Sequence, residues 1–150
     1  MDAIDIKILE MLQEDANKTV KEMAKELALT ATPVYERIKK MEKSGLIKQY
    51  VALLDTDMLN KNIIVFMNVT IKDHQKESRD TFIESMKCLP EVTEFYYTSG
   101  SFDFLAKVRF SNIKEYRDFL VNKVTGISGI SDIDSQIVLE EIKYSTKVSL

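Results

Sequence analysis

The sequence predicts an α+β protein made of two small domains, a helical one followed by one that combines a β-sheet with helices. Three observations support this. Apolar residues recur at helical spacing in three segments before residue 45, Phe102 to Phe110 alternate apolar and polar positions as a half-buried strand does, and strand and helix patterns alternate between residues 63 and 142. We expect the domains at 1–50 and 62–150, joined by a linker strand and loop at 51–61.

The composition is that of a globular chain with an ordinary apolar core. Of its 150 residues, 45% are apolar and 30% charged, with only four Gly and two Pro. The chain start lacks a signal-peptide pattern, and no apolar run approaches the roughly 18 residues of a membrane span, so we expect a cytoplasmic protein without membrane contact. A single cysteine, Cys88, suits a reducing compartment and is interpreted as a small apolar filler.

Two helices are predicted at the amino-terminal end. The first carries an apolar stripe from Ile4 to Leu12. The second begins at a capping box formed by Thr19 and Glu22, three residues apart, and continues the apolar spacing to Leu27. Ala28 and the residue after it leave room only for a tight turn before the next helix.

A third helix is predicted from Thr30, its expected N-cap, to Gly45, with Val34, Ile38 and Met41 facing the core. Residues 29–50 hold five basic and two acidic residues, whereas residues 1–28 hold four basic and seven acidic ones, although the whole chain carries a net charge of −3. Two short helices with a tight turn between them, the second basic on its outer face, match the geometry that places a recognition helix in the DNA major groove. A charged helix face is often merely solvated, but the order of the helices favours DNA binding.

We therefore expect the third helix to contact double-stranded DNA. The residues predicted to contact base edges or groove walls are Thr32, Glu36, Lys39 and Lys40. The residues predicted to hold phosphates are Thr30, Arg37 and Lys43, with Tyr35 on the flank of the same helix. Glu36 either accepts a hydrogen bond from a cytosine amino group or positions Arg37 or Lys40.

The second domain is predicted to have the element order βαββαβ, a ferredoxin-like layer of sheet and helices. The expected strands are 63–71, 92–98, 102–110 and 133–142, and the expected helices are 76–88 and a second one that starts at a capping box of Asn112 and Glu115. Residues 48–54 are also β-prone.

The predicted sheet offers a reason for self-association. We expect Leu105, Phe95 and Tyr97 on the face away from the core residues Phe102, Phe104 and Phe110. An apolar second face on an antiparallel sheet needs a cover, so the sequence predicts a dimer.

Two segments resemble the Lrp/AsnC (leucine-responsive, asparagine-responsive) transcription regulators. Residues 29–47, LTATPVYERIKKMEKSGLI, resemble the helix-turn-helix of that family, and the opening DAIDIKIL resembles its start, although Asn17 stands where many members carry Arg. In the second domain, the Gly-x-x-Asp segment Gly100–Asp103 within the βαββαβ order resembles the family's ligand-sensing domain. The resemblance covers essentially the whole chain and implies a (winged) helix-turn-helix, a sequence-specific transcription regulator and a small-molecule effector, typically an amino acid.

The resemblance also implies an effector site between dimers, lined by the Gly-x-x-Asp loop and by nearby strand and helix ends. Carried over to this chain, its residues are Thr98, Ser99, Gly100, Asp103, Ile113, Gln136, Ile137 and Val138. A carboxylate such as Asp103 suits an α-amino group, and the backbone N–H donors of a Gly turn suit an α-carboxylate. A purely structural role for Gly100 and Asp103 stays open.

The resemblance further implies homo-oligomers, often four dimers joined in a ring as an octamer. A two-fold axis would place two recognition helices about one DNA turn apart, or a multiple of it.

No pattern in the sequence indicates an enzyme, a cofactor or a metal site. The chain has one His, His74 in a polar loop, and no phosphate loop, dinucleotide fingerprint or zinc spacing. Two alternatives remain. Relatives with this two-domain layout act on tetrapyrroles as decarboxylases, which would favour histidines in the second domain. A helix-turn-helix can also dock a protein partner, and such binding would depend little on salt, unlike contacts with DNA phosphates.

Overall fold

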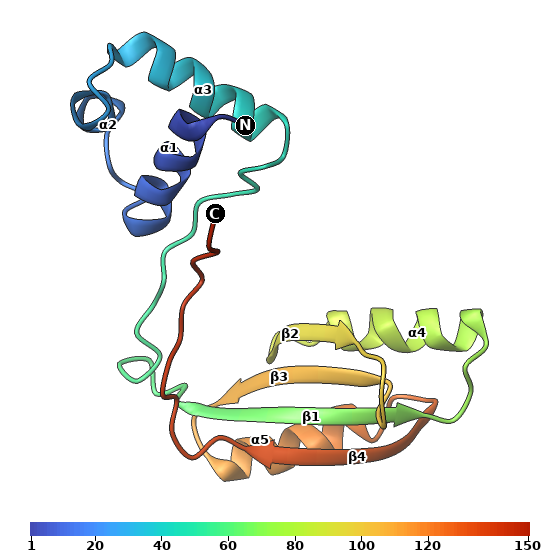
Figure 1. Ribbon diagram of the computed structural model, residues 1–150. Helices are drawn as coiled ribbons and strands as arrows, with labels where there is room; N and C mark the ends of the chain where they lie inside the picture. The colour runs from blue at the N-terminus through green and yellow to red at the C-terminus, as the bar shows by residue number, and fades with distance from the viewer. The chain divides into compact units, whose positions relative to one another are not determined.

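The computed structural model describes residues 1–150 and shows two compact units (Figure 1). The first unit consists of Met1–Leu53 and Ile142–Leu150, and the second of Leu54–Glu141. The carboxy-terminal residues Ile142–Leu150 thus pack with the helical unit. None of the helices is long and apolar enough to cross a membrane.

The first unit contains the three expected helices, α1 (Ala3–Glu14), α2 (Val20–Glu26) and α3 (Ala31–Lys43). The capping box of α2 is present: the Thr19 N–H donates to Glu22 Oε2 at 2.8 Å, and the Glu22 N–H donates to Thr19 Oγ1 at 3.3 Å. The buried side chains of the three helices form one core, made of Ile8, Leu9, Met23, Ala24, Val34, Ile38 and Met41. The predicted inward face of α3 is thus confirmed.

The turn between α2 and α3 is held by its backbone. The Leu29 N–H donates to the Ala24 carbonyl at 2.9 Å and the Ala28 N–H to the Lys25 carbonyl at 3.3 Å, which is the Schellman arrangement for a helix end. Ala28 takes the left-handed conformation there, with φ of 54°, a position that glycine usually fills. Glycine does fill the matching position after α3, where Gly45 has φ of 78°.

Thr30 occupies the N-cap position of α3, but its side chain makes no capping hydrogen bond, contrary to our expectation. A capping oxygen accepts from the N–H of the second or third helical residue. The third residue here is Pro33, which has no N–H to donate. The Thr30 hydroxyl is consequently left exposed at the start of the helix.

The carboxy-terminal segment of the first unit is tied to the end of α1. The Gln13 side chain accepts from the Val148 N–H at 2.6 Å and donates to the Val148 carbonyl at 3.1 Å. Lys147 Nζ lies 3.4 Å from Glu14 Oε1. An amide side chain thereby satisfies both backbone groups of a residue that belongs to no helix or strand.

The second unit contains β1 (Ile63–Ile71), α4 (Lys76–Lys87), β2 (Val92–Tyr97), β3 (Phe104–Phe110), α5 (Ile113–Phe119) and β4 (Ile130–Ile137), and a π-helical turn, Leu120–Val124, continues α5. The sheet order is β2-β3-β1-β4, with every neighbouring pair antiparallel. The helices bury Phe82, Met86, Tyr116 and Phe119 against one face of this sheet. The predicted ferredoxin-like order is confirmed.

Two strand predictions differ from the structure. The last strand runs from Ile130 to Ile137 instead of 133–142, because β1, its antiparallel neighbour, begins at Ile63. After the Val138 N–H donates to the Ile64 carbonyl, β1 offers no further partner. No strand forms within residues 51–61, expected as a linker strand and loop. A strand needs a neighbour to receive its hydrogen bonds, and Val51, Leu53 and Leu54 instead expose their side chains.

Phe95 and Tyr97 lie on the helix-covered face of the sheet, so their predicted position was wrong. Their ring centroids lie 5.2 Å and 5.0 Å from that of Phe104 in the core. The cause is a register shift between Val92 and Glu94, which changes the alternation of β2 so that Val92 and Phe95 both pack toward the helices. Leu105 does lie on the other face, paired with Tyr96.

Candidate DNA-binding surface and effector loop

The outer face of α3 presents nearly all of the side chains expected to contact DNA. Because Val34, Ile38 and Met41 are held in the core, the helix turns the following exposed residues away from it: Thr32, Tyr35, Glu36, Lys39, Lys40 and Lys43. Glu36, Lys40 and Lys43 have no hydrogen-bond or ion-pair partner within the protein. Their charges are therefore available to a ligand.

Lys39 is held in place by neighbours on the same surface. Its Nζ lies 2.7 Å from Glu42 Oε2 and 5.7 Å from the centroid of the Tyr35 ring. Glu42 also accepts a hydrogen bond from the Tyr50 hydroxyl at 3.1 Å. The hydrogen bond with Lys39 lowers the pKa of Glu42, and the same bond raises the pKa of Lys39. Glu42 thus offsets the charge of Lys39 but not that of Lys40 or Lys43.

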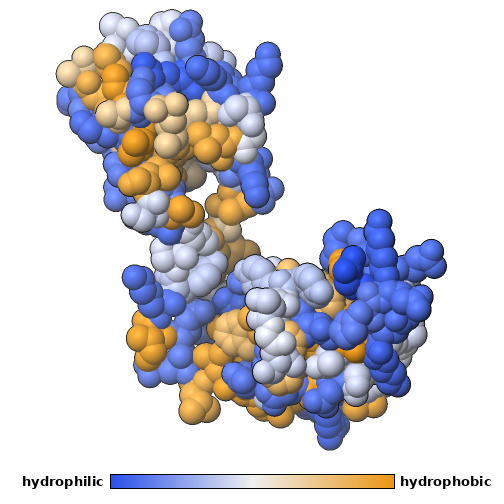
Figure 2. Space-filling view, turned by 45° about the vertical axis from the view of Figure 1, so that its right-hand side comes forward, coloured by the Kyte–Doolittle hydropathy of each residue, from blue (hydrophilic) through white to orange (hydrophobic).

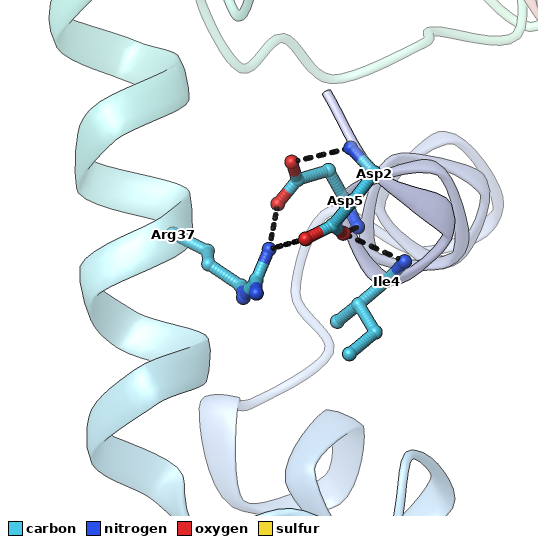
Figure 3. A network of polar contacts seen from close by, with 4 residues as sticks. All are labelled: Asp2, Ile4, Asp5 and Arg37. Carbon is cyan, nitrogen blue, oxygen red and sulfur yellow. Dashed lines mark hydrogen bonds and ion pairs between the residues drawn. The ribbon is translucent and has the colours of Figure 1, made fainter.

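Arg37 differs from the other expected DNA contacts because it points toward the start of α1 (Figure 3). Its Nη1 donates to Asp2 Oδ2 at 2.7 Å and to Asp5 Oδ1 at 2.6 Å, and 31% of the side chain is exposed. Backbone N–H groups of the helix start, together with Arg37, hold the pKa of both aspartates below the ordinary value of 3.8. This pair of carboxylates was not among the predicted site residues, although Asp2 and Asp5 have the spacing of a capping box.

The predicted effector residues of the loop before β3 form a closed turn. The Thr98 N–H donates to the Asp103 carbonyl at 2.8 Å and the Thr98 hydroxyl to the Phe102 carbonyl at 2.9 Å. Between them Gly100 has φ of 151°, a conformation that other residues rarely adopt. Ser99 and Gly100 are exposed at the tip of this turn.

Asp103 uses one carboxylate oxygen within the fold. Its Oδ2 accepts from the Ile71 N–H at 2.9 Å, where β1 ends, and its Oδ1 lies 3.7 Å from His74 Nδ1. The side chain is 20% exposed, so the second oxygen is the one that a bound amine would reach. His74, interpreted from the sequence as an ordinary solvated residue, lies beside this carboxylate.

The other predicted effector residues lie at the opposite end of the sheet. Ile113 begins α5 directly after β3, and Gln136–Val138 end β4 beside Ile64 and Phe66. The loop at Asp103, by contrast, precedes β3 next to Val69. Since the seven residues of β3 lie between the two ends, the ends are about 20 Å apart in one chain. One copy alone does not bring the eight predicted residues together.

No group of three or more His, Cys, Asp or Glu side chains is placed to hold a metal ion. The structure instead combines a partly basic helix surface with a second unit built on a four-stranded sheet. This arrangement is that of a DNA-binding regulator of the helix-turn-helix class.

Comparison with protein families places the chain within this class. A winged helix-turn-helix DNA-binding model matches residues 1–48, and the Lrp/AsnC ligand-binding-domain model matches residues 64–148. The chain belongs to the Lrp/AsnC family of transcription regulators.

Similar proteins match over almost their full length. The glutamate uptake regulatory protein of Zymomonas mobilis is 35% identical over 150 residues, covering 100% of this chain and 91% of that protein. Among solved structures, an AsnC-family transcriptional regulator from Agrobacterium tumefaciens is 39% identical with a TM-score of 0.95, covering 99% of this chain and 97% of that one. A transcriptional regulator from Neisseria meningitidis in complex with L-Met is 32% identical with a TM-score of 0.94, covering 99% and 96%. The chain is accordingly a DNA-binding transcription regulator with a separate ligand-binding domain.

Proposed function

We propose that the outer face of α3 reads operator DNA, with Lys40 and Lys43 on phosphates and Thr32 and Glu36 toward base edges. The observation that carries this proposal is that Glu36, Lys40 and Lys43 are exposed without a partner in the protein, while the opposite side of α3 is locked in the core. Tyr35, Lys39 and the exposed hydroxyl of Thr30 extend the same surface. In the folded chain Arg37 is engaged elsewhere, so the surface carries less free positive charge than the sequence indicates.

Because the outer face of α3 carries little free positive charge, one copy should bind DNA weakly, and two copies should bind more tightly. We propose a homodimer, and a ring of four dimers as its larger form, that presents two copies of α3 to a pseudo-palindromic site. Exposed apolar side chains support self-association: Val51, Leu53 and Leu54 lack any cover within the chain, and such patches appear orange in Figure 2. The second unit has an apolar surface of its own, with Phe66 and Leu105 half-buried on the sheet face away from the helices.

The ligand of the second unit is proposed to be an amino acid. Its α-amino group would lie at Asp103 Oδ1 and its α-carboxylate at the backbone N–H groups around Gly100. The complex of the similar Neisseria meningitidis regulator with L-Met makes methionine the first candidate to test. We further propose that the protein acts in the cytoplasm and through binding alone, without a catalytic step.

The DNA-reading surface is tested by the double variant Lys40→Ala, Lys43→Ala. Binding is measured by fluorescence anisotropy on a duplex that the wild-type protein selects from random DNA, across a range of salt concentrations. Loss of two phosphate contacts in each copy, four in the proposed dimer, should weaken binding and make the slope of log K against log salt shallower by about 4.

A matched control carries Lys76→Ala and Lys114→Ala, two exposed lysines of the second unit, and so loses the same charge elsewhere. It should keep the wild-type slope. If the α3 variant also keeps that slope, α3 does not contact phosphates and the proposed surface is wrong. A binding constant insensitive to salt in the wild type would instead indicate a protein partner.

A further inference from the structure

Arg37 and the two aspartates at the start of α1 form a closed hydrogen-bond network. Asp2 Oδ1 accepts from the N–H groups of Ile4 and Asp5, at 2.9 Å and 3.0 Å, and Asp5 Oδ2 accepts from the Asp2 N–H at 2.9 Å. The remaining oxygen of each carboxylate accepts from Arg37 Nη1 (Figure 3). All four carboxylate oxygens are thus used, two for capping α1 and two for holding α3.

The network adds polar contacts between two helices that the apolar core already joins. In the core, Ile8 of α1 packs with Val34 and Ile38 of α3, and apolar contacts are not directional. The contact from Arg37 to Asp2 and Asp5 adds a second, directional fixing point near the first turn of α1. The apolar core and the Arg37 network together restrict the rotation of α3 about its own axis more than the core alone would.

The same network borders the residues that face DNA. One hollow of the first unit is lined by Met1, Asp2, Asp5, Pro33, Glu36, Arg37 and Lys40. Glu36 precedes Arg37 in the chain, and Lys40 follows it by three residues, so a small rotation of α3 moves both of these side chains relative to a base edge.

We infer that Arg37 is a positioning residue, which locks the start of α1 to α3 and so sets the direction in which Glu36 and Lys40 meet the bases. It does not serve as a phosphate contact. The inference rests on the proposed DNA-reading face of α3. It makes Asp2 and Asp5, which no DNA-binding pattern in the sequence singles out, determinants of sequence preference.

The alternative is that Arg37 leaves the aspartates and binds a phosphate when DNA arrives. The two ideas predict opposite signs for Asp5→Asn. Asparagine keeps a capping oxygen but removes a negative charge near the DNA, so electrostatics alone would strengthen binding, and a released Arg37 would strengthen it further. A positioning role predicts weaker binding to the selected duplex, because the lock is loosened.

The test measures Asp2→Asn and Asp5→Asn separately on the duplex selected by the wild-type protein and on a random duplex of equal length. We expect about a tenfold loss on the selected duplex, the value of one good base contact, with no loss on the random duplex and no change in salt slope. Glu10→Gln removes the same charge from the exposed side of α1, away from the network, and should leave the preference for the selected duplex intact. Equal or tighter binding of the selected duplex by both Asn variants would overturn the inference.

A double-mutant cycle with Arg37→Gln sharpens the result. If Arg37 acts through Asp5, the variant with both substitutions binds the selected duplex no worse than Arg37→Gln alone. Independent effects, together with a salt slope made shallower by about 1 for each copy of Arg37, or about 2 in the proposed dimer, would identify Arg37 as a phosphate contact instead. Should Arg37→Gln unfold, the two Asn variants carry the test without it. If the Asn variants bind the selected duplex as the wild type does but the Lys40→Ala, Lys43→Ala variant binds DNA more weakly, only the positioning role of Arg37 is wrong. The proposed DNA-reading face of α3 would then still hold.

Discussion

The outer face of α3 and the loop from Thr98 to Asp103 are both candidate binding surfaces, but they are built in different ways. The face of α3 lies within one chain, since a single three-helix core holds the opposite side of that helix. The loop supplies one part of a predicted site whose other residues, Ile113 and Gln136–Val138, lie at the far end of the same sheet.

This difference suggests a division of roles, with DNA recognition in the first unit and its regulation by a ligand in the second. If the outer face of α3 reads DNA as proposed, each copy carries the whole reading surface, and pairing would add affinity. A site divided between the ends of a sheet forms only where two copies meet, so its ligand favours the assembly that contains it. Under the proposed effector site, ligand binding and oligomerisation would be coupled through the second unit.

The largest expected effect concerns the divided site. Asp103→Asn should weaken binding of the amino acid ligand by about 30-fold or more, because the ammonium group loses its charged partner. Titration calorimetry with the common amino acids, methionine first, identifies the ligand on the wild-type protein and then measures the variant. Asp80→Asn, an exposed aspartate on α4, is the matched control and should bind as the wild type does. If no amino acid binds to the wild type, the proposed ligand class is wrong.

Mixing subunits tests whether the site is shared. Gln136→Ala should also reduce ligand binding, by a smaller factor, from the other end of the sheet. Co-expression of Asp103→Asn and Gln136→Ala chains with different tags should restore full-affinity binding in about a quarter of the sites, if each site draws its loop from one copy and its strand end from another. Mixed assemblies without any restored sites would show that both residues act within one copy.

Local patterns were sufficient to predict most of the fold. β1 was expected at 63–71 and lies there, and the α2 capping box and the inward face of α3 depend only on residues close in sequence. The boundaries of β4 were missed, because they are set by where the neighbouring strand β1 begins and ends. The register shift in β2 could not be predicted either. Phe95 and Tyr96 place aromatic rings on opposite faces of the strand, so alternation alone does not show which face packs on the helices.

The candidate site shows the same division between local and distant information. Exposure of Lys40 and Lys43 follows from helical periodicity, which the sequence contains. Arg37 contacts Asp2 and Asp5, which lie 35 and 32 positions before it in the chain. No local sequence pattern predicts such a contact. The separation of Asp103 from Gln136 likewise becomes visible only when the strand order is known.

A smaller effect is expected from the two helix ends of the first unit, which differ in one residue type. Ala28→Gly should raise the free energy of unfolding by about 1 kcal/mol, because glycine adopts the left-handed conformation without the penalty of a Cβ. Gly45→Ala should lower it by about the same amount, and since no atom lies within 4 Å of the added Cβ, backbone strain is the only cause. Urea unfolding monitored by circular dichroism measures both. Equal signs for the two variants would contradict this account of the turns.

The smallest effect is an acid dependence that belongs to the DNA-reading unit. Asp2 and Asp5 have folded-state pKa values below the ordinary 3.8, first through backbone N–H donors and then through Arg37. A lowered carboxyl pKa stabilises the folded state above pH 3.8, and this stabilisation is lost as the pH falls through the lowered value. Between pH 5 and pH 2 the thermal midpoint of the wild type should therefore fall more than that of the Asp2→Asn, Asp5→Asn double variant, which has no carboxyl to protonate at these positions. Calorimetry over this range measures the difference, and identical pH profiles would mean that the network gives α3 no anchoring by charge.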